Sequence, residues 1–173
     1  GPGFSKELID EMENDTRFHR AMDKYVTEHE GGYVNIKEDR GKETKYGITK
    51  KWYPKEDIKN MTKERASAIL YRDYWNYGKI NTLPDDLVDI VFDNAIVQGQ
   101  PTAMKHLHEA LDLPKGGTIV GKESHKKLQE LDHDLIKKRF IKNVQNREDE
   151  ITEKDPSQKL FQKGWRIRSN HYK

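Results

Sequence analysis

The feature that most constrains the fold is an apolar segment near the middle of the chain, LPDDLVDIVFDNAIVQG, at residues 83–99. Its apolar side chains recur on nearly every side of a helix with 3.6 residues per turn: Leu87, Val88, Ile90, Val91, Phe92, Ala95 and Ile96. A helix that is apolar nearly all round needs other elements to cover it. We therefore expect a buried central helix surrounded by further helices.

Several other segments have helical spacing. In TRFHRAMDKYVTEHE, residues 16–30, apolar residues recur every three or four positions, and Gly31 follows as a stop. Candidate N-terminal caps stand in front of it: Asn14, Asp15 and Thr16. Further helices are expected at 62–75 with a Thr62 cap, at 101–113, and near 122–131, 134–150 and 157–169. The predicted fold class is mostly α.

Residues 33–48 lose the helical period. Tyr33, Val34 and Ile36 on one side, and Thr44, Tyr46 and Ile48 on the other, flank the polar stretch EDRG. β-branched and aromatic residues on both sides of a polar, glycine-containing turn are typical of a hairpin. We expect one small β-hairpin, inserted after the first long helix.

Composition indicates a folded protein that needs no cross-links. The chain has 173 residues, of which 33% are hydrophobic and 36% charged, with Trp 3, Tyr 8 and Phe 5. Disordered chains usually lack so many aromatic residues. There is no cysteine, which excludes disulfides and thiolate metal sites. No segment approaches the roughly 18 apolar residues of a membrane span, and no signal peptide is visible. Gly1-Pro2-Gly3 resembles the remnant of a cleaved expression tag, so a native leader is still compatible with the sequence.

Charge is unevenly distributed along the chain. Residues 1–113 hold 17 Lys and Arg against 21 Asp and Glu, whereas residues 114–173 hold 15 against 9. A basic end can bind a polyanion such as a cell-wall polymer or a nucleic acid, but it can also be an ordinary solvated helical surface.

Glu30 is the first candidate for chemistry. If the α-helical period of about 100° per residue is continued from Phe18, Glu30 falls at the flank of the apolar stripe, in the last turn. The negative end of the helix dipole and partial desolvation both raise the pKa of a carboxyl group. Gly31-Gly32 leaves space for a bulky substrate. This arrangement suits a general acid, although an ordinary acid at a frayed helix end is the alternative.

Asp39 and Thr44 are candidates for the second half of such a reaction. Asp39 lies in the expected hairpin turn and Thr44 on the returning segment, where either could orient a water molecule opposite Glu30. An Asp in a turn is also a common turn-forming residue. The spacing does not separate an inverting pair of groups from a retaining pair.

The chain resembles a known family of glycosidases. HEGGYV at residues 29–34, the Asp-x-Gly-x-x-Thr-Lys-Tyr-Gly-Ile-Thr run at 39–49, LYRDYW at 70–75 and the segment 83–99 are similar to the N-acetylmuramidases of glycoside hydrolase family 108. That family comprises lysozyme-like domains of phage endolysins and secretion activator proteins. The resemblance covers roughly residues 16–170. From Leu131 onward, ending in FQKGWRIR, the chain resembles the peptidoglycan-binding helical segment that completes these proteins.

The resemblance implies a lysozyme-like fold and a role for Glu30. Glu30 matches the Glu of the family's Glu-Gly-Gly-Tyr motif, the catalytic acid. The interval from Asp39 to Thr44 is one residue shorter than in phage-type lysozymes, which resemble this region. The chain departs from the family pattern at three positions: Lys42 replaces a common Gly, Gln98 a common Asn, and His108 a common Gln.

Other motifs in the chain have simple structural explanations beside a functional one. HEGGY lacks the second histidine of the His-Glu-x-x-His zinc motif, and His106 and His108 face different sides of their helix, so we expect no metal and no cofactor. The segment YRDYW could stack on sugar rings or pack in the core with an Arg72–Asp73 surface pair. Asp93 and Asn94 lie within an apolar helix and need polar partners, either in the groove floor or on a neighbouring helix.

The sequence thus predicts a peptidoglycan hydrolase that cleaves the β-1,4 bond between N-acetylmuramic acid and N-acetylglucosamine. The predicted catalytic residues are Glu30, Asp39 and Thr44, and the predicted substrate-binding residues are Tyr33, Tyr46, Asp93 and Asn94. The alternatives are a lytic transglycosylase and a non-catalytic wall-binding module; no nucleic-acid motif is present.

The expected organisation is an N-terminal segment at 1–15, a catalytic region at 16–130, and a peptidoglycan-binding segment at 131–173 packed on the same domain. We expect a monomer that is made in the cytoplasm and acts on the cell wall, in the periplasm or outside the cell; release by a holin is one route compatible with this expectation.

Overall fold

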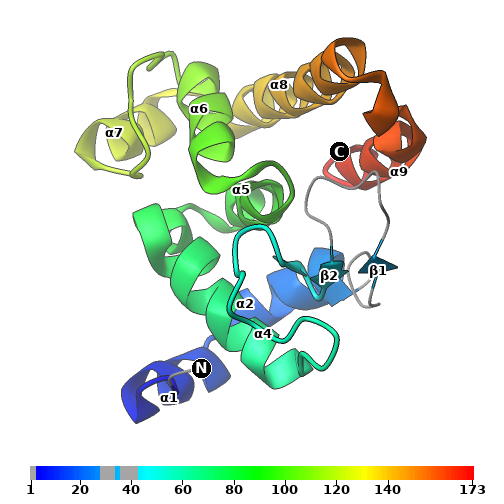
Figure 1. Ribbon diagram of the computed structural model, residues 1–173. Helices are drawn as coiled ribbons and strands as arrows, with labels where there is room; N and C mark the ends of the chain where they lie inside the picture. The colour runs from blue at the N-terminus through cyan, green and yellow to red at the C-terminus, as the bar shows by residue number, and fades with distance from the viewer. Residues whose placement is uncertain (1–2, 28–33, 36–42) are drawn as a thin grey trace. The chain divides into compact units, whose positions relative to one another are not determined.

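A computed structural model of the chain describes residues 3–27, 34–35 and 43–173 (Figure 1). The chain divides into two compact units, Gly1–Tyr77 and Gly78–Lys173. The region expected as catalytic, 16–130, therefore contributes to both units, whereas 131–173 belongs entirely to the second.

Helices of the first unit begin where the sequence supplies polar caps. The side chains of Ser5, Asp15 and Thr62 accept hydrogen bonds from the backbone N–H groups of the first turns of α1, α2 and α4. The helical elements of this unit are α1 (Lys6–Glu13), α2 (Thr16–Ala21), the π-helical segment η1 (Met22–Val26), α4 (Lys63–Leu70) and the π-helical segment η2 (Tyr71–Asn76). Helix α1 was not expected from the sequence, and it packs against α4.

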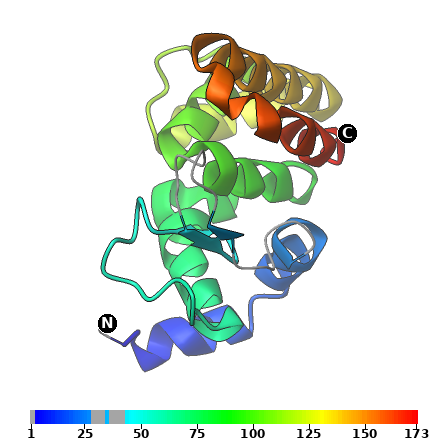
Figure 2. The same cartoon turned by 45° about the vertical axis from the view of Figure 1, so that its right-hand side comes forward.

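The sheet of the first unit has three short strands in the order β1-β2-β3: Val34–Asn35, Glu43–Lys45 and Ile48–Thr49. Both neighbouring pairs are antiparallel, with Val34 opposite Thr44 and Thr44 opposite Thr49. The predicted hairpin is confirmed by the first pair. The second pair adds a strand that the sequence did not reveal. The teal strand arrows are visible in Figure 2.

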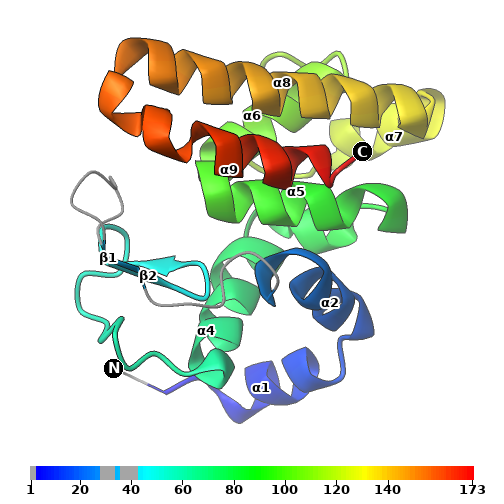
Figure 3. The same ribbon diagram turned by 90° about the vertical axis from the view of Figure 1, so that its right-hand side faces the viewer.

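The second unit is a set of helices around α5. It contains η3 (a 3₁₀-helical segment, Tyr77–Thr82, which begins at the last residue of the first unit), α5 (Asp85–Gln98), α6 (Gln100–Ala110), α7 (Lys122–Glu130), α8 (His133–Lys154), η4 (Pro156–Gln158) and α9 (Lys159–Asn170). Helix α5 packs against α6 and α8, and α9 runs beside α8, as Figure 3 shows.

The predicted central helix is confirmed by burial. In α5 every residue from Leu87 to Ala95 is buried, including the three polar side chains Asp89, Asp93 and Asn94. The helices expected near 122–131, 134–150 and 157–169 are also present, and α8 extends four residues further than predicted, to Lys154. The mostly α, lysozyme-like fold class is therefore confirmed.

Candidate active site

Asp15 fixes the start of the helix that leads toward Glu30. One carboxylate oxygen accepts a hydrogen bond from the backbone N–H of Phe18 at 3.1 Å. The other accepts hydrogen bonds from the Tyr71 hydroxyl and the Trp75 indole N–H, each at 3.0 Å. The Phe18 ring meets the Tyr71 and Trp75 rings edge-on, with centroids 4.8 and 5.6 Å apart. One carboxylate thus caps α2 and joins it to η2.

The same contacts decide between the two explanations offered for YRDYW. Tyr71 and Trp75 are only 1% and 0% exposed, so they belong to the core and present no surface to a sugar ring. Arg72 forms the expected ion pair with Asp73, at 2.7 Å. The Tyr53 hydroxyl donates a hydrogen bond to Asp73 at 2.8 Å, and burial, reinforced by Tyr74 and Asp73, raises the pKa of Tyr53 above its ordinary value.

A π-helical segment changes the expectation for Glu30. In η1 the backbone N–H of Thr27 donates to the carbonyl of Met22, five residues earlier, instead of four as in an α-helix. The sequence argument turned the chain by 100° per residue from Phe18 to Glu30, and that regular period does not hold across Met22–Val26. The regular period on which the predicted position of Glu30 rests is therefore interrupted within the described residues, and the position of Glu30 itself stays a prediction.

Three of the predicted site residues are not placed by the structure. Glu30, Tyr33 and Asp39 lie outside the described residues. Their roles therefore remain predictions. The structure does place the elements on either side of them, namely η1 before Glu30 and the strands β1 and β2 on either side of Asp39.

Thr44 lies at the centre of the small sheet. It is half-buried on β2, the middle strand, and its backbone is paired on both sides, with Val34 and with Thr49. A hydroxyl carried on the middle strand of a sheet is held more rigidly than one on a loop. The backbone that carries the Thr44 hydroxyl is thus held from both sides, and the role of that hydroxyl in orienting a water molecule stays a prediction.

Tyr46 was expected on the returning strand, and that placement is wrong. Tyr46 and Gly47 form the two-residue turn between Lys45 of β2 and Ile48 of β3, with φ angles of 53° and 84°. Positive φ at both turn positions matches the right-handed twist of antiparallel strands. A tyrosine at positive φ is uncommon and costs on the order of 1 kcal/mol or more. Such strain often marks functional positions, which keeps Tyr46 a candidate for substrate binding.

Asp93 is occupied by the C-terminal segment of its own unit. Its carboxylate is 0% exposed and forms a two-point ion pair with the Arg168 guanidinium, and it accepts a hydrogen bond from the Tyr172 hydroxyl at 2.5 Å. A substrate would have to displace these partners. The geometry therefore favours the neighbouring-helix explanation for Asp93, and a substrate contact stays an untested prediction.

Asn94 has a different environment from Asp93. Its side chain is 0% exposed, and neither its amide nitrogen nor its amide oxygen has a hydrogen-bond partner among the described residues. Buried polar groups are nearly always paired, so an unpaired amide needs an explanation. The polar atoms of Asn94 are thus unpaired among the described residues, but the side chain is as buried as Trp75 and presents no surface to a substrate in this structure, so its binding role stays a prediction.

Sequence reasoning missed Arg168 and Tyr172 as the partners of Asp93. The sequence did indicate that Asp93 needs a partner, because a carboxylate within an apolar helix requires a cation or hydrogen-bond donors. The partners lie 75 and 79 residues further along the chain, and no local pattern identifies them.

Within residues 3–27, 34–35 and 43–173, no group of three His, Cys, Asp or Glu side chains is arranged to hold a metal ion. No helix in these ranges is long and apolar enough to cross a bilayer.

Helices that surround α5, with a small antiparallel sheet after the first long helix, define a lysozyme-like protein. Residues 24–99 match the family described as glycosyl hydrolase 108. The solved structure described as "Structure of Brucella abortus SagA" is similar to this chain, with 26% sequence identity, 90% coverage of each chain and a TM-score of 0.76. No curated protein matches the chain.

The chain accordingly has a lysozyme-like fold and is a glycoside hydrolase, and its similarity to glycosyl hydrolase 108 extends over residues 24–99. The matched range contains all seven predicted site residues, from Glu30 to Asn94.

Proposed function

We propose that the protein is an N-acetylmuramidase, which cleaves the β-1,4 bond between N-acetylmuramic acid and N-acetylglucosamine in peptidoglycan. The observation that carries the proposal is the match of residues 24–99 to glycosyl hydrolase 108, because this range includes the motif around Glu30 and the small sheet. The lysozyme-like arrangement of helices supports the same substrate class.

Glu30 is the proposed general acid. Glycoside cleavage needs a carboxylic acid that is still protonated at the working pH, so that it can donate a proton to the leaving oxygen. An unperturbed Glu has a pKa of about 4.3, and a rise of about two units, equivalent to roughly 2.7 kcal/mol, brings it into this range. Gly31-Gly32 leaves room for the sugar beside the acid.

Thr44 and Asp39 are the proposed groups on the other side of the bond. The Thr44 hydroxyl, fixed on the middle strand, can hold the attacking water by a hydrogen bond, and the Asp39 carboxylate can accept its proton. Tyr33, Tyr46 and Asn94 are the proposed substrate contacts. Tyr46 contributes an aromatic ring at a strained turn, and Asn94 a buried amide with no described partner.

The binding partner in this proposal is the bacterial cell wall. Residues 131–173, which form α8, η4 and α9, are proposed to hold the wall while the enzyme acts on it in the periplasm or outside the cell, as a monomer. The excess of basic residues after residue 113 supports this role.

The test is Glu30→Gln, which keeps the shape of the side chain but removes the transferable proton. Activity on purified peptidoglycan should fall by a factor of about 10² to 10⁴. Glu28→Gln, two residues earlier, is the matched control and should retain activity. A Glu30→Gln enzyme with wild-type activity would refute the assignment.

The products of the same assay distinguish the alternatives. Hydrolysis leaves reducing ends, with N-acetylmuramic acid at the new end for a muramidase. A lytic transglycosylase, which also needs a single acid, leaves 1,6-anhydro ends. A binding module would sediment with peptidoglycan and release no products.

A further inference from the structure

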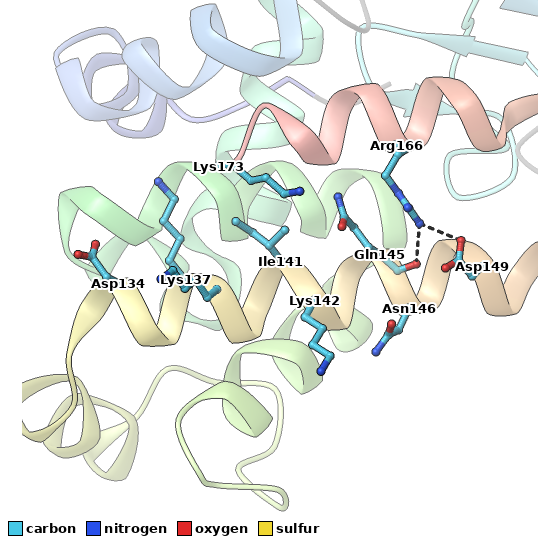
Figure 4. A pocket seen from close by; sticks show the side chains of 10 residues that line it. Asp134, Lys137, Ile141, Lys142, Gln145, Asn146, Asp149, Arg166 and Lys173 are labelled. Carbon is cyan, nitrogen blue, oxygen red and sulfur yellow. Dashed lines mark hydrogen bonds and ion pairs between the residues drawn. The ribbon is translucent and has the colours of Figure 1, made fainter.

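An open groove runs along one face of α8, beside α9, entirely within the second unit (Figure 4). Its lining comes from α8 at spacings of three and four residues, from Asp134 to Asp149, with Arg166 and Lys173 on the other side. This stretch of α8 is about 22 Å long at 1.5 Å per residue. The groove is therefore long enough for several units of a polymer.

The walls of the groove are held together by α9. The Arg166 guanidinium lies 2.8 Å from Glu148 and 2.8 Å from Asp149, and it also donates to the carbonyl of Gln145. The amide nitrogen of Gln145 donates in turn to Ser169 and Asn170 at the end of α9. Figure 4 shows Arg166 reaching across to α8. The only arginine of the groove is thus used to join the two helices.

The lysines of the groove are not used in this way. Lys137, Lys138, Lys142 and Lys173 all line it, and none of them has an ion pair with another described residue. Arg166 shares its single charge between Asp149 and the buried Glu148, so some negative charge remains at that end of the groove, while Asp134 at the other end has no ion pair among the described residues. Between Asp134 and Asn146 the groove therefore presents unpaired positive charge.

The cations left in the groove limit how an anion can be held. The two-pronged guanidinium of arginine suits planar carboxylate and phosphate alike, but here it is occupied; the remaining lysine ammonium groups act as compact point charges, which bind phosphate without a fixed two-point geometry. We propose that this groove binds a phosphodiester polymer of the bacterial cell envelope, of the poly(glycerol phosphate) type. Consecutive phosphates would contact Lys137, Lys138, Lys142 and Lys173 in turn, and the site does not depend on which glycosidic bond the enzyme cleaves.

The test compares two matched pairs of lysines. Lys138 and Lys142 are exposed, four residues apart and in the groove on α8; Lys122 and Lys126 are exposed and four residues apart on α7. Each pair is changed to glutamine in the full chain, and binding to poly(glycerol phosphate) is measured at about 50 and about 200 mM salt. With about 0.7 counterions released per contact, the wild type should weaken about 50-fold over this range, and Lys138→Gln/Lys142→Gln only about 7-fold.

Lys122→Gln/Lys126→Gln should keep the wild-type affinity and salt dependence. The proposal is overturned if both double variants lose affinity equally, if the wild type does not bind the polymer, or if polyglutamate of equal length binds as tightly. Tighter binding of single-stranded DNA than of poly(glycerol phosphate) would instead make the groove a nucleic-acid site. Each readout is independent of hydrolysis, so an inactive Glu30→Gln enzyme should bind the polymer like the wild type.

Discussion

Arg168, near the end of α9, forms a buried two-point ion pair with Asp93 in α5, and the two side chains are 8% and 0% exposed. The Tyr172 hydroxyl donates to the same carboxylate. One carboxylate in the central helix thus anchors the last helix of the chain. Since α9 also forms a wall of the α8 groove, the pair fixes an element of the proposed polymer-binding surface.

Removing one partner of this pair should destabilise the fold strongly. Asp93→Asn keeps the volume but breaks the buried ion pair with Arg168, and removing one partner of such a pair typically costs about 3–5 kcal/mol. Urea denaturation at neutral pH measures the loss. The matched control is Asp112→Asn, which breaks the exposed pair of Asp112 with Arg139, 3.3 Å apart, and should cost less than about 1 kcal/mol. Equal losses in the two variants would contradict the anchoring role.

Asp15 should contribute more than an ordinary helix cap. Asp15→Ala removes the cap of α2 and also the hydrogen bonds that the carboxylate accepts from two buried groups, the Tyr71 hydroxyl and the Trp75 N–H. A lost cap costs about 1 kcal/mol and the loss of one partner of a buried hydrogen bond about 1–3 kcal/mol, so we expect a loss of roughly 3 kcal/mol or more. Thr62→Ala, which removes only a cap, provides the comparison in thermal denaturation. The prediction fails if the two variants are equally stable.

Stability should fall in weak acid because of His106. Burial, with smaller effects of Lys105 and Arg147, lowers the pKa of His106 from 6.5 to about 4, while Glu150 opposes the shift. Below pH 6.5 the unfolded chain therefore binds a proton that the folded chain does not. The stabilisation is complete above pH 6.5 and is lost between pH 6.5 and pH 4, by roughly 2–3 kcal/mol.

The measurement is urea denaturation at pH 7 and pH 4.5 for the wild type and His106→Gln. Glutamine can still donate to Gln98, as the His106 ring does at 2.8 Å, so the variant should lose less stability on acidification. Burial lowers the pKa of His108 as well, which leaves a smaller acid dependence of the same sign in the variant. Identical acid dependence in both proteins would show that His106 is not the group responsible.

The sequence predicted those parts of the fold that depend on local pattern. The all-round apolar segment identified α5, and the Thr62 cap identified the start of α4. The π-helical segment before Glu30 was missed because its buried residues keep the spacing of an ordinary helix. The turn at Tyr46 was missed because Tyr-Gly is not the usual Asn-Gly signal. The partner of Asp93 was missed because an ion pair across 75 residues leaves no local trace.

Asn94 gives the sharpest separation of stability from function. Its amide is fully buried, and no described residue forms a hydrogen bond with it. The amide group therefore contributes no described hydrogen bond to the stability of the folded state. Replacing an unpaired buried polar group by an apolar one of similar shape is nearly neutral or stabilising. Asn94→Leu should therefore leave the melting temperature unchanged or raise it, by up to a few degrees.

If Asn94 holds the substrate as proposed, kcat/KM of Asn94→Leu on peptidoglycan should fall at least tenfold, because a substrate group loses its partner in a site without water to replace it. Ile96→Leu, a conservative change two residues away on α5, is the control for repacking and should alter neither quantity much. A destabilised Asn94→Leu protein would instead mean that folding depends on the amide. Full activity in a stable variant would remove Asn94 from the site.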